Sequence, residues 1–329
     1  MTRTADDTRA TSLIFPSQPD TLASIVDFGR FARKQRARRL WIGQSLRIES
    51  HLAMAALAAH VPGLPLGSSV ALTPLMHPYE AAVEARSLSA LSGATYVAGY
   101  GPGAPEFQKA FLKDPYDKPL RAVHEYASLV RRLLDGEMVD HRGEHYAVTS
   151  SLIPMPAPPV EVGLGVLRTG MARTAGRVAD VAITWLTPHW YVAEQLRPAL
   201  EEGAAQEGRK TPRVAAVVHA AVTRPARNLR RCAHAAAGVH LSTGHYTDML
   251  RKAGIEADPK TPRKGVDALI DSGVYVTGSP DEVAAGLRKF RESGVDEVIL
   301  NLSGVYFTEG EAAALRDLRD ILHAEDGGE

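Results

Sequence analysis

Residues 94–111 read ATYVAGYGPGAPEFQKAF, a strand-like segment that runs through closely spaced glycines into a helix-compatible one. Gly99, Gly101 and Gly103 stand at the end of the expected strand. Glycines there leave the backbone open, because no Cβ keeps a planar ligand or a phosphate away. We therefore predict that a cofactor contacts these three glycines, with a plain tight turn as the alternative.

Seven other short apolar runs also precede helix-compatible segments, which makes eight β-then-α units. This pattern predicts an α/β fold of the (β/α)8 TIM-barrel type with insertions. The alternative is a doubly wound open sheet, but no GxGxxG motif follows the first run. The eight predicted strands lie at residues 12–15, 39–42, 66–72, 94–98, 160–163, 180–184, 214–222 and 297–301.

The spacing of these runs also predicts the domain organisation. We expect a flexible tail at residues 1–11, one barrel domain at 12–323 and a second tail at 324–329. The segment between the last two predicted strands is much longer than a simple strand-to-strand connection requires. Residues 225–277 are therefore predicted to be an insertion with its own helices.

Composition narrows the classes of partner. The 329 residues include 45% apolar and 23% charged side chains with a formal net charge of zero, as in ordinary globular proteins. No block of like charge is long enough to follow a phosphate backbone, so we expect no nucleic-acid partner. The basic cluster at residues 30–39 is interpreted as a solvated helix end.

Cysteine usage and hydropathy suggest a reducing, aqueous compartment. Cys232 is the single cysteine, so no intrachain disulfide is possible, and we predict no metal site. Residues 1–10 are polar, and no window approaches 18 consecutive apolar residues. A cytoplasmic protein without a membrane span is the expectation.

In a barrel, the active site lies at the carboxyl ends of the strands. Those ends are poor in acids, bases and metal ligands, and HExxH, GxSxG and Walker motifs are absent. His77, His189 and Glu106 lie just beyond strand ends, where solvated loop residues are the alternative interpretation. Such a site indicates a cofactor that carries the reaction while the protein supplies shape and hydrogen bonds.

Residues 163–169, GLGVLRT, are the best candidate for binding a phosphate. Backbone amides at a helix N-terminus with Arg168 beside them favour an anion. A plain left-handed turn is the alternative.

A series of short motifs extends this interpretation. They are LWIG at 40–43, LGSSV at 66–70, TP at 73–74, HP at 77–78, VAGYG at 97–101, PYDKPL at 115–120, LLDGE at 133–137, VEVGLG at 160–165, AD at 179–180, GSPDEV at 278–283 and GVDE at 294–297. In this order and spacing, the chain resembles the bacterial luciferase-like family of flavin and deazaflavin oxidoreductases. The resemblance covers nearly the whole length and implies a barrel with insertions, a homodimer and a flavin-type tricycle at the strand ends.

Within that family, residues 116–137 are similar to the subgroup that uses coenzyme F420. The resemblance places Gln44 and Ser45 at the second-strand end that faces the redox ring. It places a bulge with a strained peptide bond behind the ring, and a phosphate loop after the fifth strand. The cofactor-binding residues that it implies are Gln44, Val70, Ala71, Leu72, Thr73, Gly165, Val166 and Leu167.

Three positions depart from the family pattern. Deazaflavin sugar-phosphate dehydrogenases carry an acid and a histidine where this chain has Pro102 and Ser45. Alcohol oxidation by an acid/base pair is therefore disfavoured. Val166 stands where a second glycine is typical of the phosphate loop.

The leading hypothesis is a reductase that passes a hydride from reduced F420 to a polarised alkene, imine or enamide. The substrate is a small molecule or a modified peptide, for example dehydroalanine in a natural-product pathway. Ser45, Tyr100 and Glu106 are the candidate catalytic residues, with Tyr100, Glu106 or water as proton donor. The alternatives are an FMN-dependent monooxygenase and a cofactor-free binding subunit. His240, His245 and Tyr246 in the insertion either line the pocket mouth or pack.

Overall fold

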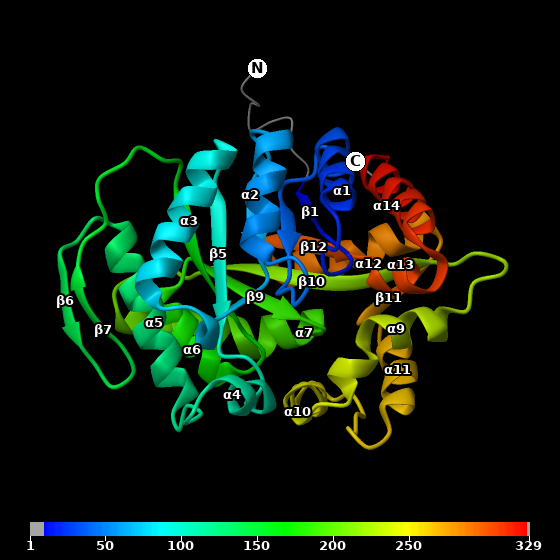
Figure 1. Ribbon diagram of the computed structural model, residues 1–329. Helices are drawn as coiled ribbons and strands as arrows, with labels where there is room; N and C mark the ends of the chain where they lie inside the picture. Colours follow the sequence, from blue (N-terminus) through cyan, green and yellow to red (C-terminus); the bar gives the residue numbers. More distant parts are fainter. Residues whose placement is uncertain (1–9, 328–329) are drawn as a thin grey trace. The chain divides into compact units, whose positions relative to one another are not determined.

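The structure is a computed structural model and describes residues 10–327. The predicted tails lie partly outside this range; within it, β1 begins at Thr11 and α14 ends at Asp326. The strands of Figure 1 are β1 Thr11–Ile14, β2 Leu40–Ile42, β3 Leu66–Ser68, β4 Ala71–Leu72, β5 Tyr96–Gly101, β6 Val139–Arg142, β7 Ala147–Ser150, β8 Val160–Gly165, β9 Val181–Trp185, β10 Arg213–Val222, β11 Tyr275–Gly278 and β12 Glu297–Asn301. The helices are α1 Leu22–Lys34, α2 Ser50–His60, η2 Thr73–Leu75, α3 Pro78–Ser92, α4 Pro105–Phe111, α5 Pro119–Leu134, α6 Thr169–Val178, α7 His189–Tyr191, η3 Val192–Leu196, α8 Arg197–Gln206, α9 Leu229–Leu241, α10 Gly244–Lys252, α11 Pro262–Asp271, α12 Pro280–Glu292, α13 Ser303–Glu309 and α14 Glu311–Asp326.

The large sheet closes on itself. Its hydrogen-bonded order is β1-β2-β3-β5-β8-β9-β10-β12, and β12 pairs in parallel with β1. Two further strands join this ring, because β4 pairs with β5 and β11 pairs with β10. The predicted TIM barrel is confirmed, and the alternative of an open sheet is wrong.

The third predicted strand, residues 66–72, is divided into two. β3 ends at Ser68, a cis peptide bond joins Ser69 and Val70, and β4 begins at Ala71. The resemblance placed an unusual peptide bond in this segment. Because of the break, β3 pairs with Tyr96 and Val97, whereas β4 pairs with Tyr100 and Gly101 of the same strand.

The described chain forms two compact units. Unit 1 holds residues 18–183 and 199–213, and unit 2 holds residues 10–17, 184–198 and 214–327. The prediction of a single domain remains a prediction. The predicted catalytic and cofactor-binding residues all fall in unit 1, whereas His189, His240, His245 and Tyr246 fall in unit 2.

Helices α2 and α3 lie side by side in unit 1, with α3 against β5 (Figure 1). Glu49 caps α2 by accepting hydrogen bonds from the amides of His51 and Leu52, both at 2.8 Å. Helix α3 ends at Gly93, which has a φ of 65° and so takes the left-handed turn that favours glycine. These caps fix where the two helices begin and end.

Arg39 departs from the prediction of a solvated basic cluster. It is 4% exposed, and its guanidinium donates to the carbonyls of Leu66 at 2.9 Å and Thr95 at 3.1 Å. Its Cζ also lies 5.7 Å from the ring centre of Trp41. Arg39 therefore ties β2 to the starts of β3 and β5.

In unit 2, the predicted insertion contains α9, α10, α11 and most of β11. The long strand β10 holds it to the sheet. Residues 215–219 of β10 pair with β12, and residues 219–222 pair with β11. The insertion is therefore joined to the barrel by main-chain hydrogen bonds.

A buried ion pair also lies in unit 2. The guanidinium of Arg227 donates to Asp317 of α14, and both side chains are fully buried. Arg227 also donates to both carboxylate oxygens of Glu309 at 2.7 Å, and Arg224 donates to Asp317 at 3.0 Å. Burial lowers the pKa of Arg227, but its hydrogen bonds to Glu309 and Asp317 raise that pKa by more.

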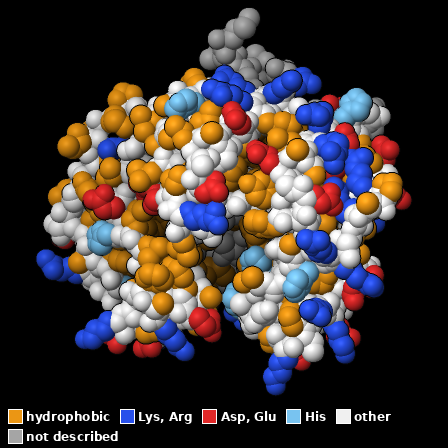
Figure 2. All heavy atoms as spheres, turned by 45° about the vertical axis from the view of Figure 1, so that its right-hand side comes forward, with side chains coloured by type: hydrophobic (Ala, Val, Ile, Leu, Met, Phe, Trp, Pro, Cys, Tyr) orange, Lys and Arg blue, Asp and Glu red, His pale blue; other side chains and the backbone are white. Residues whose placement is uncertain are grey.

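Among the described residues, no helix is both long and apolar enough to cross a membrane. On the face that Figure 2 shows, basic and acidic side chains are interspersed. That face therefore carries no extended patch of one sign.

Candidate functional site at the strand ends of unit 1

Gln44 connects the end of β2 to β4. Its amide oxygen accepts a hydrogen bond from the Leu72 amide at 3.2 Å, and its Nε2 donates to the Ser45 carbonyl at 3.2 Å. The structure thus brings together two predicted segments that are 28 residues apart. Both groups of the Gln44 side chain are engaged, so its orientation is fixed.

Ser45 is 4% exposed and belongs to a tight network at the start of α2. Its amide donates to Ser50 Oγ at 2.9 Å, and Ser50 Oγ donates to the Gly43 carbonyl at 2.8 Å. The Ser45 hydroxyl oxygen accepts from the Arg47 amide at 3.1 Å. This geometry gives Ser45 a structural role, and its predicted catalytic role remains a prediction.

Val70 lies against two of the predicted glycines. An ideal Cβ on Gly101 would stand 2.9 Å from Val70 Cγ2, and one on Gly165 would stand 3.5 Å from both Val70 methyl groups. Val70, Gly101 and Gly165 come from three segments and meet at one place. The Val70 side chain therefore occupies the space that these two glycines leave open.

Gly99 is also required for packing between strands. A Cβ there would lie 2.1 Å from the Ser68 carbonyl oxygen and 2.5 Å from Ile183 Cδ1. The Ser68 hydroxyl accepts from the Gly99 amide at 2.8 Å and donates to the Gly99 carbonyl at 3.1 Å. The prediction that Gly99 opens the backbone to a ligand is corrected, because protein atoms fill that space. Gly103, with a φ of 71°, is the predicted turn glycine, and its contact with a cofactor remains a prediction.

Tyr100 points into the helix layer. Its hydroxyl donates to the Ala81 carbonyl of α3 at 3.3 Å, and its ring meets Tyr126 edge to face with centroids 5.2 Å apart. Tyr100 is 3% exposed, and burial raises its pKa well above the ordinary value. This geometry gives Tyr100 a packing role between β5 and α3, and its role as a proton donor remains a prediction.

Glu106 lies in the first turn of α4 and is exposed. It makes no hydrogen bond or ion pair to another described residue. Nothing in this geometry holds its carboxylate toward Gln44 or Ser45, and its proposed role as a proton donor remains a prediction. His77 caps α3 by accepting from the Tyr79 amide at 3.2 Å.

The predicted phosphate loop needs one correction. The Val166 amide donates to the Ile183 carbonyl at 2.7 Å, and Val166 is 1% exposed. That amide cannot bind a phosphate, because it is part of the sheet. Arg168 is the N-cap residue of α6 and makes no side-chain cap hydrogen bond. The anion-binding amides are therefore expected at the first turn of α6, at residues 169–171.

Thr73 and its neighbours line a cavity of about 680 Å³ that sequence reasoning missed. Thr73 is 2% exposed, and its hydroxyl has no hydrogen-bond partner among residues 10–327. Tyr116 and Tyr146 also line the cavity, with their hydroxyl oxygens 2.7 Å apart. The PYDKPL motif and the β6–β7 hairpin could be recognised in the sequence, but the contact between them could not be predicted from it.

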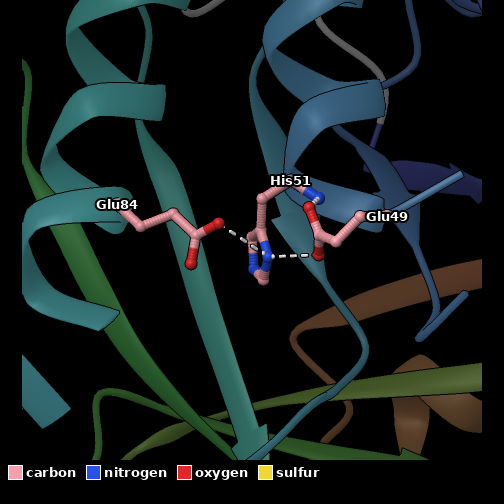
Figure 3. Close-up of side chains that lie close together, drawn as sticks. All are labelled: Glu49, His51 and Glu84. Atoms are coloured by element: carbon pink, nitrogen blue, oxygen red, sulfur yellow. Dashed lines mark hydrogen bonds and ion pairs between the residues drawn. The ribbon is translucent and has the colours of Figure 1, made fainter. Parts of the chain in front are cut away.

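A second missed cluster joins α2 to α3 (Figure 3). His51 Nδ1 lies 2.9 Å from Glu49 Oε1 and 2.9 Å from Glu84 Oε1. Burial lowers the pKa of His51, but the two carboxylates more than reverse this and raise it to about 9. The positive charge of the protonated imidazole balances the nearby carboxylates, so no metal ion is needed to do so. We therefore interpret this cluster as an ionic clamp and not as a metal site.

In unit 2, Asn301 ends β12 and orients His219. The Asn301 amide oxygen accepts from the Ser303 amide at 2.8 Å, so its Nδ2 faces His219 Nε2 at 3.2 Å as a donor. His219 is fully buried, and burial lowers its pKa to about 3. The His240 ring lies 5.4 Å from Trp185 and 4.8 Å from Tyr246, measured between centroids. The packing interpretation of His240 and Tyr246 is thereby supported.

The sequence profile of the luciferase-like monooxygenase family matches residues 2–297. The chain belongs to this family. It is 26% identical over 262 residues to the F420-dependent glucose-6-phosphate dehydrogenase of Nakamurella multipartita, which covers 76% of this chain and 75% of that protein.

Solved structures share the fold. The coenzyme F420-dependent tetrahydromethanopterin reductase of Methanopyrus kandleri superimposes with a TM-score of 0.74 at 19% identity, over 96% of this chain and 97% of that one. The oxygenating constituent of 3,6-diketocamphane monooxygenase from Pseudomonas putida, solved with FMN, has a TM-score of 0.67 at 17% identity, over 94% and 96%.

Of the matched proteins named here, two are named for their dependence on F420 and one was solved with FMN. The strand ends of unit 1 fit such a cofactor. Their polar side chains, Gln44, Ser45 and Thr73, are neutral, and the Thr73 hydroxyl lacks a partner within the described chain. No carboxylate of this group would repel a phosphate-bearing ligand.

Proposed function

We propose that the protein is an F420-dependent reductase that transfers a hydride to a polarised double bond. The observation that carries this proposal is the chemistry of the strand ends in unit 1. Gln44, Ser45 and Thr73 offer amide and hydroxyl groups, and Tyr100 is held in the helix layer by Ala81. Residues of this kind suit the binding and orientation of a redox cofactor, and none of them is a carboxylate or an imidazole that would titrate near neutral pH.

Each group has a positioning task in this proposal. Bound F420 in its reduced form would supply the hydride. The fixed amide of Gln44 sets the edge of the ring site, and Val70 forms its apolar wall beside Gly101. The first turn of α6 offers backbone amides to the phosphate. The proton that completes the reduction comes from water or from the substrate's surroundings.

The chemistry favours an alkene, imine or enamide over an alcohol as substrate. Oxidising an alcohol requires a base that removes the hydroxyl proton. Pro102 and Ser45 stand where the sugar-phosphate dehydrogenases of the family carry an acid and a histidine. A dehydroalanine in a small molecule or modified peptide is a substrate of the favoured kind.

Titration of the purified protein with F420 and with FMN tests the cofactor. We expect F420 to bind with a Kd on the order of micromolar and FMN to bind at least tenfold more weakly. Gln44→Ala should weaken F420 binding, whereas Gln206→Ala, a change of the same residue type at the exposed end of α8 in the same unit, should not. Micromolar FMN binding without F420 binding would reject the proposal.

The second candidate is an FMN-dependent monooxygenase. The fold similarity to a diketocamphane monooxygenase solved with FMN favours it. Here the apolar wall that Val70 forms would help to exclude water from the bound cofactor. Substrate-dependent oxygen uptake with a flavin reductase present would support this candidate. A protein that fails both cofactor titrations would instead be a binding subunit of the same fold.

We also propose that the protein forms a homodimer through α2 and α3. Leu52 on α2 is 68% exposed, and Leu91 on α3 is 60% exposed. Ile153, 80% exposed, adjoins α3 because its carbonyl accepts a hydrogen bond from Arg86 at 2.6 Å. Analytical ultracentrifugation of the wild type and of Leu52→Glu tests this, with a shift from dimer to monomer as the expected result.

A further inference from the structure

The cavity beside Thr73 contains buried polar atoms that nothing in the described chain satisfies. It has a volume of about 680 Å³, within the range of small-molecule sites. Thr73 Oγ1 and His145 Nε2 both lack a hydrogen-bond partner within residues 10–327, and both residues line it. Buried polar atoms without partners are rare in folded proteins, and they indicate that a ligand or water completes the site.

The lining of the cavity carries an excess of negative charge. Asp114, Asp117 and Glu144 line it, and neither lysine nor arginine does. Lys118 and Arg121 each lie 3.9 Å from Glu144, but their side chains are 56% and 70% exposed. Within the described residues, Asp114 and Asp117 form no ion pair. A cation therefore gains energy here, whereas a phosphate or carboxylate is repelled.

Aromatic rings supply the remaining wall. Tyr116 and Tyr146 share a hydrogen bond between their hydroxyls, and the His77 ring stands edge-on to Tyr146 at 6.1 Å between centroids. Burial and the hydrogen bond shared with Tyr116 raise the pKa of Tyr146, so that its phenol stays neutral. Neutral phenols offer both oxygen acceptors and ring faces to a cation.

The position of Thr73 connects this cavity to the expected ring site. Thr73 directly follows Leu72, whose amide donates to Gln44. The cavity therefore borders the segment that positions the ring. A substrate long enough to extend from the cavity to that segment would have the proximity that hydride transfer needs.

We propose that this cavity is a substrate subsite that binds a primary ammonium group. The inference rests on the proposed function for its assignment to a substrate, but the binding itself is measurable without cofactor. The ammonium can belong to a free amine or to a lysine side chain or N-terminus of a peptide. In each case the carboxylates of Asp114 and Asp117 in the cavity lining are the charged acceptors.

Three probes of one shape test the charge preference. Benzylammonium, benzyl alcohol and benzoate are titrated into the wild-type protein and followed by ligand-observed saturation-transfer NMR. Benzylammonium should bind at least threefold more tightly than benzyl alcohol, and benzoate should be the weakest. Equal binding of benzoate and benzylammonium would overturn the proposal.

Matched variants then locate the site. Asp114→Asn/Asp117→Asn should weaken benzylammonium binding roughly fivefold, because two partly solvated carboxylates are lost. Asp140→Asn, an exposed charge change in the neighbouring hairpin, should leave it unchanged. Thermal unfolding of each variant identifies any misfolded protein, and Tyr116→Phe serves as a second lining variant. Loss of binding in Asp140→Asn alone would place the probe elsewhere and contradict the assignment.

Two peptides distinguish the sources of the ammonium. One has a blocked N-terminus and a lysine, and the other has a free N-terminus and no lysine; the tighter binder identifies the source. The F420 titration is repeated on Asp114→Asn/Asp117→Asn, where its affinity should stay within about twofold of wild type. F420 binding without benzylammonium binding rejects the subsite alone, whereas the reverse result rejects the proposed function alone.

Discussion

The side chain of Val70 fills the space beside Gly101. A Cβ on Gly101 would lie 2.9 Å from Val70 Cγ2, closer than such atoms approach in folded proteins. Gly101→Ala should therefore lower the free energy of unfolding by about 1–3 kcal/mol. Val70→Ala in the same chain should recover part of that loss, since it removes the contacting methyl group.

A double-mutant cycle in urea measures this coupling. Gly244→Ala is the control, because no atom lies within 4 Å of the added Cβ. Strictly additive losses in the double variant would show that Val70 and Gly101 are not in contact in solution.

The clamp of Figure 3 predicts a loss of stability at alkaline pH. The pKa of His51 is raised to about 9 in the folded protein from an ordinary 6.5. The stabilisation is therefore fully present below pH 6.5 and is lost as pH rises through about 9. His51→Gln should be less stable than wild type at pH 6, and this difference should shrink by pH 10.

Urea unfolding at a series of pH values checks this behaviour. His60→Gln, a change on the exposed last turn of the same helix, should run parallel to wild type. A pH-independent deficit in His51→Gln would mean that the ring contributes by packing and not by charge.

The buried ring of His219 predicts a loss of folding stability at acidic pH. Its pKa is lowered to about 3 when folded, so between pH 6.5 and 3 the unfolded chain binds more protons than the folded one. Stability is consequently present above pH 6.5 and is lost as pH falls toward 3. His219→Gln should flatten this acid limb, and calorimetry from pH 7 to 4 measures the change in slope.

Removing one charge of the buried Arg227–Asp317 pair in unit 2 should strongly destabilise the fold. Asp317→Asn leaves the Arg227 guanidinium buried beside a neutral amide. We expect a loss of about 3–5 kcal/mol in the free energy of unfolding. Asp320→Asn is the comparison, because Asp320 is 35% exposed and pairs with the outer Arg224. A loss in Asp317→Asn no larger than in Asp320→Asn would argue that the pair is hydrated.

Tyr100→Phe separates a packing role from a chemical one. The lost hydrogen bond to Ala81 should cost about 1 kcal/mol of stability. Cofactor affinity should remain within twofold of wild type, because the hydroxyl faces α3. A large loss of cofactor binding with unchanged stability would indicate that the Tyr100 hydroxyl contacts the cofactor.

The sequence was sufficient to predict the barrel because each strand is a short apolar run with a helix after it. The family resemblance directed attention to Gln44 and to the segment around Val70. The direction of individual groups was harder. Tyr100 and Gly101 are adjacent in sequence, yet one faces the helix layer and the other faces Val70.

Contacts between distant segments account for the remaining errors. The Val166 amide is taken by Ile183, and Gly99 is required by Ser68, 31 residues earlier in the chain. His51 and Glu84 likewise meet only because α2 and α3 lie together. Periodicity and spacing carry no information about such pairings, since these depend on strand register and helix packing.

Helix α2 links two properties that are usually measured separately. Its first residue, Ser50, holds Gly43 and Ser45 on either side of Gln44, and the next residue is His51. Deprotonating the imidazole would loosen this helix and, with it, the segment on which Gln44 rests. Raising the pH through the pKa of His51, about 9, should therefore weaken cofactor binding while the barrel is still folded. A cofactor titration would then detect the loss of the His51 proton at a lower pH than global unfolding does.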